Sequence, residues 1–319
     1  MIKGRSAKLL VMIPAVLALL TSVAYGTSDF VAGITSRRIS SVDVALWSQV
    51  AGAVLLVAAL ALSGQRPDAS GLAWGAASGV IAALGVLVFY RALAIGPTTV
   101  VSPIAAGGVA VPVLVGALGG ETPSAVVGVG LLAAVGGMAI VSLANSEDPE
   151  DVAQPCPGRK PLLKRSVSPV AVNVGNPRQV VPLALLAALC FGSFFVLLDL
   201  GTAGAEASVL WVALGVEAGS LLTTAGVALF SHRHGGGLRL PPVGLLVPIG
   251  LVGVLAVCGS VSLAYATASG QLGVVSVLAS LDILVTVLLA RIVLAERLRR
   301  LQSAGVVLSV VGVVLISAG

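Results

Sequence analysis

The chain has 319 residues and a formal net charge of +5; 57% of its residues are hydrophobic and only 10% are charged. A soluble domain usually carries about 25% charged residues, so this composition excludes an ordinary water-soluble enzyme, a nucleic-acid-binding protein and a disordered chain. The basic residues flank apolar stretches, as in integral membrane proteins, and an apolar mass of Ala, Val, Leu and Gly favours closely packed helices in lipid.

The first apolar stretch follows three basic residues, Lys3, Arg5 and Lys8, as the apolar part of a signal peptide does. The stretch continues past Gly26 toward Phe30, which is long enough to span a bilayer, and further apolar stretches follow it. We therefore interpret it as a retained first transmembrane helix.

Ten apolar stretches of roughly twenty residues can be counted, the length that crosses ~30 Å of hydrocarbon as an α-helix. Their hydrophobicity is continuous rather than alternating, which predicts helices rather than strands. The predicted spans are residues 9–31, 43–63, 71–93, 98–118, 123–144, 179–200, 207–230, 242–267, 271–293 and 302–318.

The fourth span contains Pro103, Pro112 and the pair Gly107-Gly108. Breaks in a spanning helix are tolerated only where the backbone faces protein or a cavity, so we expect this helix to be interrupted and to act as a cavity wall and hinge. Its counterpart in the second half of the chain, around 276–282, carries the charge of Asp282 in place of a break.

A polar stretch from 145 to 178 separates the fifth and sixth spans. It holds four acidic and five basic residues together with six prolines, which break helices. We predict a linker here, between a first five-helix repeat at 1–144 and a second at 179–319.

The two halves repeat each other. Residues 92–103 read ALAIGPTTVVSP and residues 266–277 read ATASGQLGVVSV, and an acidic residue follows each of these segments, Glu121 and Glu296. An odd number of helices in each repeat places the two copies in opposite orientations, which is the inverted-repeat construction of secondary transporters. The count of basic residues on the two sides of the bilayer leaves the orientation of the termini open.

With these features the sequence resembles the drug/metabolite transporter superfamily, and within it the EamA-type family. The resemblance covers the whole chain. It is carried by the aromatic-Gly pairs Tyr25-Gly26 and Phe191-Gly192, by the tight turn between the third and fourth helices, and by the acid ending the fourth. It is closest at 278–296, where Asp282 and Glu296 stand fourteen residues apart. Ile283 replaces the proline that is common in the family, and Gly107 stands where the first half would have its counterpart of Asp282. The resemblance implies export or exchange of small metabolites or drugs.

Ionisable side chains inside a bilayer cost on the order of 2.5–3.5 kcal/mol at a helix centre, so each asks for a reason. Glu217 and Asp282 lie near the middle of the seventh and ninth spans. One interpretation is a pair of protonatable carboxyl groups in a water-filled cavity; the other is a neutral carboxyl that hydrogen-bonds a neighbouring helix.

Other residues are candidates for a substrate site. Arg91 could bind an anionic group or extend to the interface, and Asp29 could pair with it or meet the headgroups. The scarce aromatic side chains could wall a site or serve packing; they include Tyr25, Tyr90, Phe191 and Phe194.

Three glycine pairs spaced four residues apart predict close helix contacts: Gly75/Gly79, Gly116/Gly120 and Gly215/Gly219, the last on the face of its helix away from Glu217. Glu121 and Glu296 precede helices, and we expect them to interact with helix N-termini.

The leading hypothesis is a secondary transporter in the plasma (inner) membrane, with small-molecule substrates and either proton coupling or exchange. The sequence lacks a Walker motif, G-x-S-x-G and H-E-x-x-H, so we expect neither ATP hydrolysis nor enzymatic activity. Two histidines are too few for a dedicated metal site, and we expect no cofactor and no nucleic-acid partner. A non-transporting scaffold subunit and, less favoured, an intramembrane enzyme are the alternatives.

Overall fold

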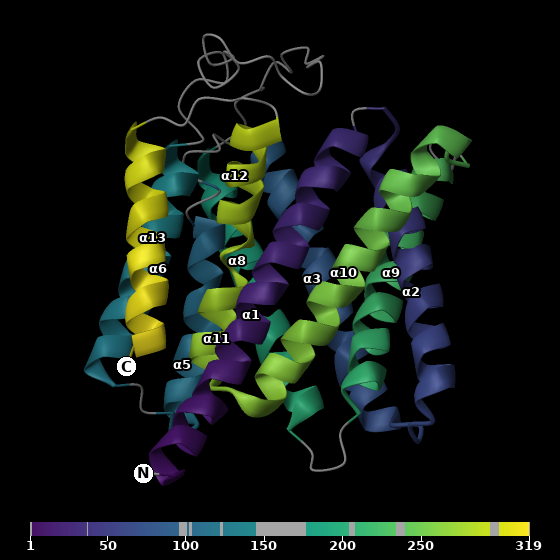
Figure 1. Ribbon diagram of the computed structural model, residues 1–319. Helices are drawn as coiled ribbons and strands as arrows, with labels where there is room; N and C mark the ends of the chain where they lie inside the picture. The colour runs from purple at the N-terminus through teal and green to yellow at the C-terminus, as the bar shows by residue number, and fades with distance from the viewer. Residues whose placement is uncertain are drawn as a thin grey trace. The chain divides into compact units, whose positions relative to one another are not determined.

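The computed structural model describes residues 2–36, 38–95, 101, 104–121, 124–144, 177–203, 208–233, 240–293 and 300–318, and the regular elements in these ranges are all helices. They are α1 (Ile2–Thr35), α2 (Ser41–Ser63), α3 (Ala69–Ile95), η1 (Gly107–Val109), α5 (Ala110–Leu118), α6 (Ala125–Ala144), α8 (Pro177–Thr202), α9 (Val209–Arg233), α10 (Val243–Ser269), α11 (Leu272–Ala279), α12 (Asp282–Val293) and α13 (Arg300–Ala318) (Figure 1).

The prediction of an all-helical membrane protein is confirmed. Seven helical segments of the described chain are long and apolar enough to cross a bilayer, and shorter apolar helices at 104–118, 125–140 and 303–316 lie at the three other predicted spans. Helices extend beyond their apolar stretches, and α1 begins at Ile2 rather than at residue 9. Lys and Arg are good helix formers, so a helix need not end where the apolar stretch ends.

The helix is interrupted both at the hinge predicted in the fourth span and at its counterpart in the ninth. In the first half, a 3₁₀ turn at Gly107–Val109 precedes α5. In the second half, the helix stops at Ala279 and restarts at Asp282. The expectation of a charge in place of a break was therefore wrong, because the second half has both. Serine hydroxyls compete for backbone carbonyls at this point: Ser280 donates its Oγ–H to the Ser276 carbonyl at 2.8 Å.

The first compact unit comprises residues 1–84 and 193–270. Within it α10 packs against α1, α2 and α9, around a buried cluster of Leu56, Ala213 and Val257. The α3 and α9 helices approach closely through two glycine pairs, as predicted. A Cβ atom on Gly75 or Gly79 would lie 2.1 Å from a backbone carbonyl oxygen of α9.

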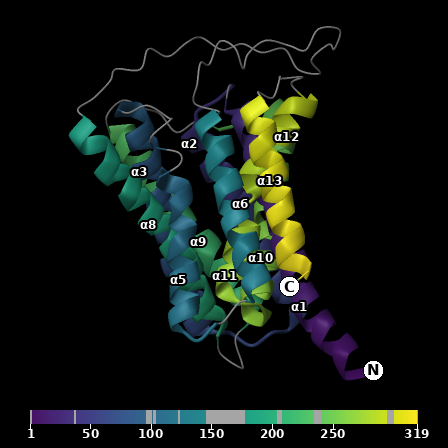
Figure 2. The same ribbon diagram turned by 90° about the vertical axis from the view of Figure 1, so that its left-hand side faces the viewer.

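The second compact unit comprises residues 85–192 and 271–319. Its most extensive contact joins α6 and α13, which lie side by side in Figures 1 and 2, and α5 packs on α11. Small residues allow the α6–α13 approach: a Cβ on Gly312 would lie 2.6 Å from the Gly130 oxygen, and Ser309 donates a hydrogen bond to the Ala134 carbonyl at 3.3 Å.

Each compact unit combines segments from both sides of the predicted linker. Two pairs of helices that correspond in the two halves contact each other, α2 with α9 and α6 with α13, and α5 of the fourth predicted span contacts α11 of the ninth. Residues 145–176 of the linker, the turn at Gly96-Pro97, Pro103 and Glu296 lie outside the described residues.

Candidate functional site

Glu217 is a buried acid within the membrane-spanning helix α9 of the first unit. Its side chain is only 5% exposed. Gly52 of α2 lies beside it: a Cβ at that position would be in ordinary contact with Glu217 Oε2, at 3.5 Å, and in tighter contact with Val257 of α10, at 3.0 Å. The carboxyl group is hydrogen-bonded to the Ser260 side chain of α10. A buried ionisable group in a spanning helix needs such a polar partner.

The Ser260 hydroxyl also connects to α1. Its Oγ lies 3.0 Å from the Tyr25 hydroxyl oxygen, and Ser260 itself is 4% exposed. The Tyr25 ring lies against Gly259, where a Cβ would be 2.6 Å from the ring. Glycine at this position therefore allows α1 to bring the hydroxyl to Ser260, and the three side chains form the cluster Tyr25–Ser260–Glu217.

Two further hydroxyls of α1 face α10 on either side of Tyr25. Thr21 donates to the Gly259 carbonyl at 3.3 Å, and Ser28 donates to the Val252 carbonyl at 3.2 Å. These positions, spaced four and three residues from Tyr25, share one helix face. The α1–α10 contact is thus held partly by polar groups, as is common between helices in lipid.

Gln49 of α2 carries a buried side-chain oxygen that has no hydrogen-bond partner in the described part of the chain. It lies one helical turn before Gly52, on the same face of α2. A buried acceptor without a donor is uncommon and calls for an explanation. Gln49 therefore joins the candidate residues of the first unit.

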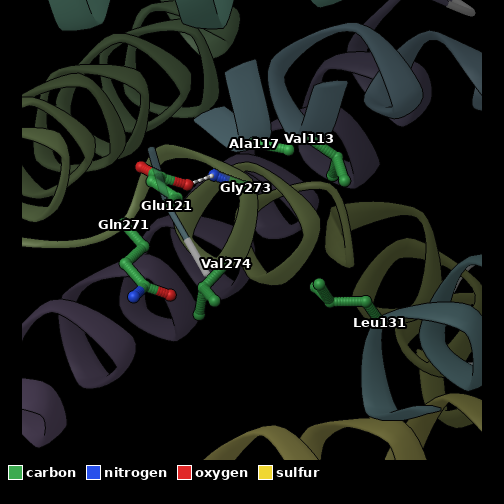
Figure 3. A pocket seen from close by; sticks show the side chains of 7 residues that line it. All are labelled: Val113, Ala117, Glu121, Leu131, Gln271, Gly273 and Val274. Atoms are coloured by element: carbon green, nitrogen blue, oxygen red, sulfur yellow. Dashed lines mark hydrogen bonds between the residues drawn. The ribbon is translucent and has the colours of Figure 1, made fainter. Parts of the chain in front are cut away.

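Glu121, in the second unit, binds the start of α11 (Figure 3). Its carboxylate accepts hydrogen bonds from the backbone N–H groups of Leu272 and of Gly273, the latter at 3.1 Å. The expected interaction with a helix N-terminus is confirmed, but the helix is α11, some 150 residues away in sequence, and not the helix α6 that follows Glu121. Negative charge at a helix N-terminus is stabilising.

The glycines before Glu121 serve this arrangement. A Cβ on Gly116 would lie 2.2 Å from Glu121 Oε2, and Gly120 has a φ of +95°, which side-chain-bearing residues rarely adopt. The expectation that Gly116 and Gly120 form a helix-docking pair was wrong, because Gly116 makes room for a carboxylate and Gly120 forms the turn.

A small cavity adjoins this carboxylate. It has a volume of about 40 Å³ and is lined by Val113, Ala117, Glu121, Leu131, Gln271, Gly273 and Val274 (Figure 3). A single water needs roughly 10–15 Å³ by this measure, so the cavity is large enough for water and too small for a metabolite. Two of its lining residues come from α5, the helix predicted to form a cavity wall.

Asp282 begins α12, directly after the break. It is half-buried, and its Oδ1 accepts a hydrogen bond from the Ile283 N–H at 2.8 Å. This surrounding differs from the continuous helix centre predicted for it. Glu217 and Asp282 belong to different compact units, and their action as a pair stays a prediction.

The remaining candidates are placed as follows. Asp29 of α1 is exposed, as are Tyr90 and Arg91 near the end of α3. Phe191 of α8 makes an edge contact with Phe89, with ring centroids 6.1 Å apart, and Phe194 contacts its neighbour Phe195 at 5.1 Å. Among the residues that the structure describes, no three His, Cys, Asp or Glu side chains gather so that they could hold a metal ion.

The sequence matches the model of the EamA-like transporter family at residues 12–143 and 179–318. The chain belongs to the EamA-like transporter family. Each matched segment falls in one of the two predicted halves, and the resemblance seen in the sequence is confirmed. The protein is therefore a multi-pass membrane protein of a transporter family.

A solved structure, titled only as the crystal structure of a protein, superposes on the chain with a TM-score of 0.70. The superposition covers 96% of both chains at 14% sequence identity, so it shows a shared fold alone. A search among curated proteins gave no significant match.

In this EamA-like chain, reasoning from sequence missed Ser260 and Gln49. A serine in an apolar helix commonly donates to the carbonyl four residues earlier, as Ser260 also does to Ala256 at 3.0 Å, so nothing in the sequence distinguishes it. Gln49 could have been chosen from the sequence because it is a polar residue inside the second predicted span, and an uncharged polar side chain is also costly to bury in lipid.

Proposed function

We propose that this EamA-like protein is a secondary transporter that exports or exchanges small solutes by alternating access, with Glu217 as its proton-binding group. The observation that carries the proposal is the Glu217 carboxyl, buried in a membrane-spanning helix and hydrogen-bonded to a hydroxyl. Such groups in transporters mark substrate and ion pathways. The family match supports the transport part of the proposal.

The helix contacts support alternating access between two repeats. A twofold relation between inverted copies would produce contacts between corresponding helices, and α2 contacts α9 while α6 contacts α13. The fourth and ninth predicted spans, which also correspond, meet through α5 and α11. The interruptions at Gly107–Val109 and at 280–281 occur at corresponding positions of the two halves. Interrupted helices supply the backbone groups and hinges that transporters of this construction use.

The substrate we infer is small and either uncharged or zwitterionic. The α10 helix, which contacts Glu217 through Ser260, contains no Asp, Glu, Lys or Arg and so brings no fixed charge to this carboxyl. Gln49, with its unsatisfied buried oxygen, would accept a hydrogen bond from an N–H or O–H group of such a solute. The other residues that we propose for substrate binding or coupling are Asp282, Asp29, Arg91, Tyr90, Tyr25, Phe191 and Phe194.

The test begins with a substrate. Purified protein is screened by thermal shift against amino acids, sugars and nucleosides, because a ligand stabilises the state it binds. A stabilising compound is then followed into proteoliposomes with and without a pH gradient. We expect gradient-driven accumulation by the wild type, and in Glu217→Gln retention of solute exchange without accumulation.

The matched control is Asp43→Asn. Asp43 is also a buried acid in a spanning helix, 5% exposed, but it lies in α2 nine residues before Gly52. Accumulation unchanged in Glu217→Gln would reject the role of Glu217. A wild type that moves none of its stabilising compounds would reject transport in favour of a scaffold.

A further inference from the structure

The Ser260 hydroxyl has one hydrogen and three polar neighbours. The neighbours are the Glu217 carboxyl, the Tyr25 hydroxyl at 3.0 Å and the Ala256 carbonyl at 3.0 Å. A hydroxyl donates one hydrogen bond and accepts two. The direction in which Ser260 donates therefore depends on whether Glu217 carries a proton.

Two arrangements fit the same heavy atoms. When Glu217 is ionised it only accepts, so Ser260 donates to it and Tyr25 donates to Ser260. When Glu217 is protonated it donates to Ser260, whose own hydrogen then turns to the Ala256 carbonyl. Ser260 accepts from Tyr25 in both arrangements, and every member of the chain is satisfied in each.

The other helices packed near Glu217 offer no comparable route in the part of the chain that the structure describes. The α2 helix presents Gly52, and its acid Asp43 lies nine residues before that glycine. Residues 69–84 of α3 contain no ionisable side chain. The α10 helix contains Cys258 and Tyr265 as its only ionisable groups, and both are exposed. On α1, Tyr25 is half-buried, and the exposed Asp29 follows it by one turn.

We propose that Ser260 and Tyr25 form the proton path to Glu217. In loading, Glu217 takes the Ser260 proton, Ser260 takes the Tyr25 proton, and Tyr25 takes one from water. The Ser260 hydrogen then turns from Tyr25 to the Ala256 carbonyl, and the Tyr25 hydrogen turns back to Ser260, which gives the arrangement with Glu217 protonated. Unloading runs in reverse, so each hydroxyl ends as it began. This inference rests on the proposed function and adds two residues that position and deliver the proton.

The path can be tested without a known substrate. Full-length protein in lipid is followed by infrared difference spectroscopy after a pH jump, and the carboxylic acid band of Glu217 is identified by its loss in Glu217→Gln. In Ser260→Ala and Tyr25→Phe we expect the band to form about a hundredfold more slowly, the lower end of what a positioned proton donor contributes. Ser260→Ala also shifts the band, because a hydrogen bond to the carboxyl is lost.

Ser28→Ala is the matched control. It removes a buried hydroxyl that joins the same two helices but bonds only a backbone carbonyl, and it is expected to leave the rate unchanged. Ser260→Thr keeps the hydroxyl and is expected to restore the rate. If Ser260→Ala fails to fold, Tyr25→Phe carries the test, since it removes a single oxygen.

The outcomes separate the two proposals. A Glu217 band that forms at the wild-type rate in both hydroxyl variants refutes the path and leaves Glu217 as the proton site. Slowing by Ser28→Ala to the same extent assigns the effect to helix packing and also refutes the path. Absence of any band that depends on Glu217 overturns the proton-binding role itself.

Discussion

The α3–α9 contact gives the sharpest test of the packing. Two glycines on each helix face the partner backbone: a Cβ on Gly79 would lie 2.1 Å from the Val216 oxygen, and one on Gly219 would lie 2.1 Å from the Ala76 oxygen. Ordinary van der Waals contact begins near 3.4 Å, so a methyl group is about 1.3 Å too close. The obstructing atoms are backbone carbonyls, which cannot rotate away.

Gly79→Ala must therefore push the helices apart or distort one of them. Overpacking of this kind lowers the free energy of unfolding by about 1–3 kcal/mol. The higher helix propensity of alanine raises it by about 1 kcal/mol. We expect a net loss of up to about 2 kcal/mol. For a domain of moderate size each kcal/mol lowers the melting temperature by about 2–4 °C.

Gly226→Ala is the matched control on α9. Nothing lies within 4 Å of a Cβ at Gly226, so this variant gains helix propensity without a clash and should be unchanged or slightly more stable. The assay is the thermal unfolding of purified protein in one detergent, with tryptophan fluorescence as the probe. Equal melting temperatures for Gly79→Ala and Gly226→Ala would refute the close backbone contact.

Two further predictions concern carboxylates at helix N-termini. Glu121→Ala removes both hydrogen bonds to the first turn of α11 and should cost about 1–3 kcal/mol, whereas Glu121→Gln keeps one acceptor oxygen and should cost less; equal melting temperatures for these two variants would contradict the paired bonds. Asp68 caps α3 by accepting from the Gly71 N–H at 2.8 Å and also accepts from the Ser208 N–H at 3.1 Å. Asp68→Ala should lower stability by about 0.5–2 kcal/mol and Asp68→Asn by less. Proteolysis at Ser208 that is no faster in Asp68→Ala would show that the bond to Ser208 contributes nothing.

Much of the fold could be predicted because lipid makes the sequence signal strong. A spanning helix needs a long apolar stretch, and small residues spaced four apart indicate close contacts, as at Gly75/Gly79 and Gly215/Gly219. The same spacing at Gly116/Gly120 misled, because sequence does not show that a carboxylate five residues after Gly116 folds back over it. The spacing of small residues predicts where a helix surface allows close approach, but it does not predict which group packs there.

The candidate site was less predictable, since its contacts join residues far apart in the chain. Tyr25 and Ser260 are separated by 235 residues, and the partner of Glu121 is 151 residues away. The sequence did indicate the kind of contact each acid would make: an acid before a helix favours binding to a helix N-terminus, and a buried acid needs a hydrogen-bond donor. Only the packing of the helices decides which N-terminus is bound and which side chain is the donor.

The two helix interruptions also differ in how well the sequence predicts them. Gly107 and Gly108 weaken the helix of the first half through backbone freedom, and that signal was readable. In the second half no glycine or proline stands at 280–281; there Ser280 bonds the Ser276 carbonyl and Asp282 bonds the Ile283 N–H. Different residues thus interrupt corresponding helices by different means. If interruption at this point is what transport requires, Asp282→Ala combined with Ser280→Ala should impair solute exchange more than Thr286→Val, which removes a hydroxyl that donates to the Asp282 carbonyl in α12.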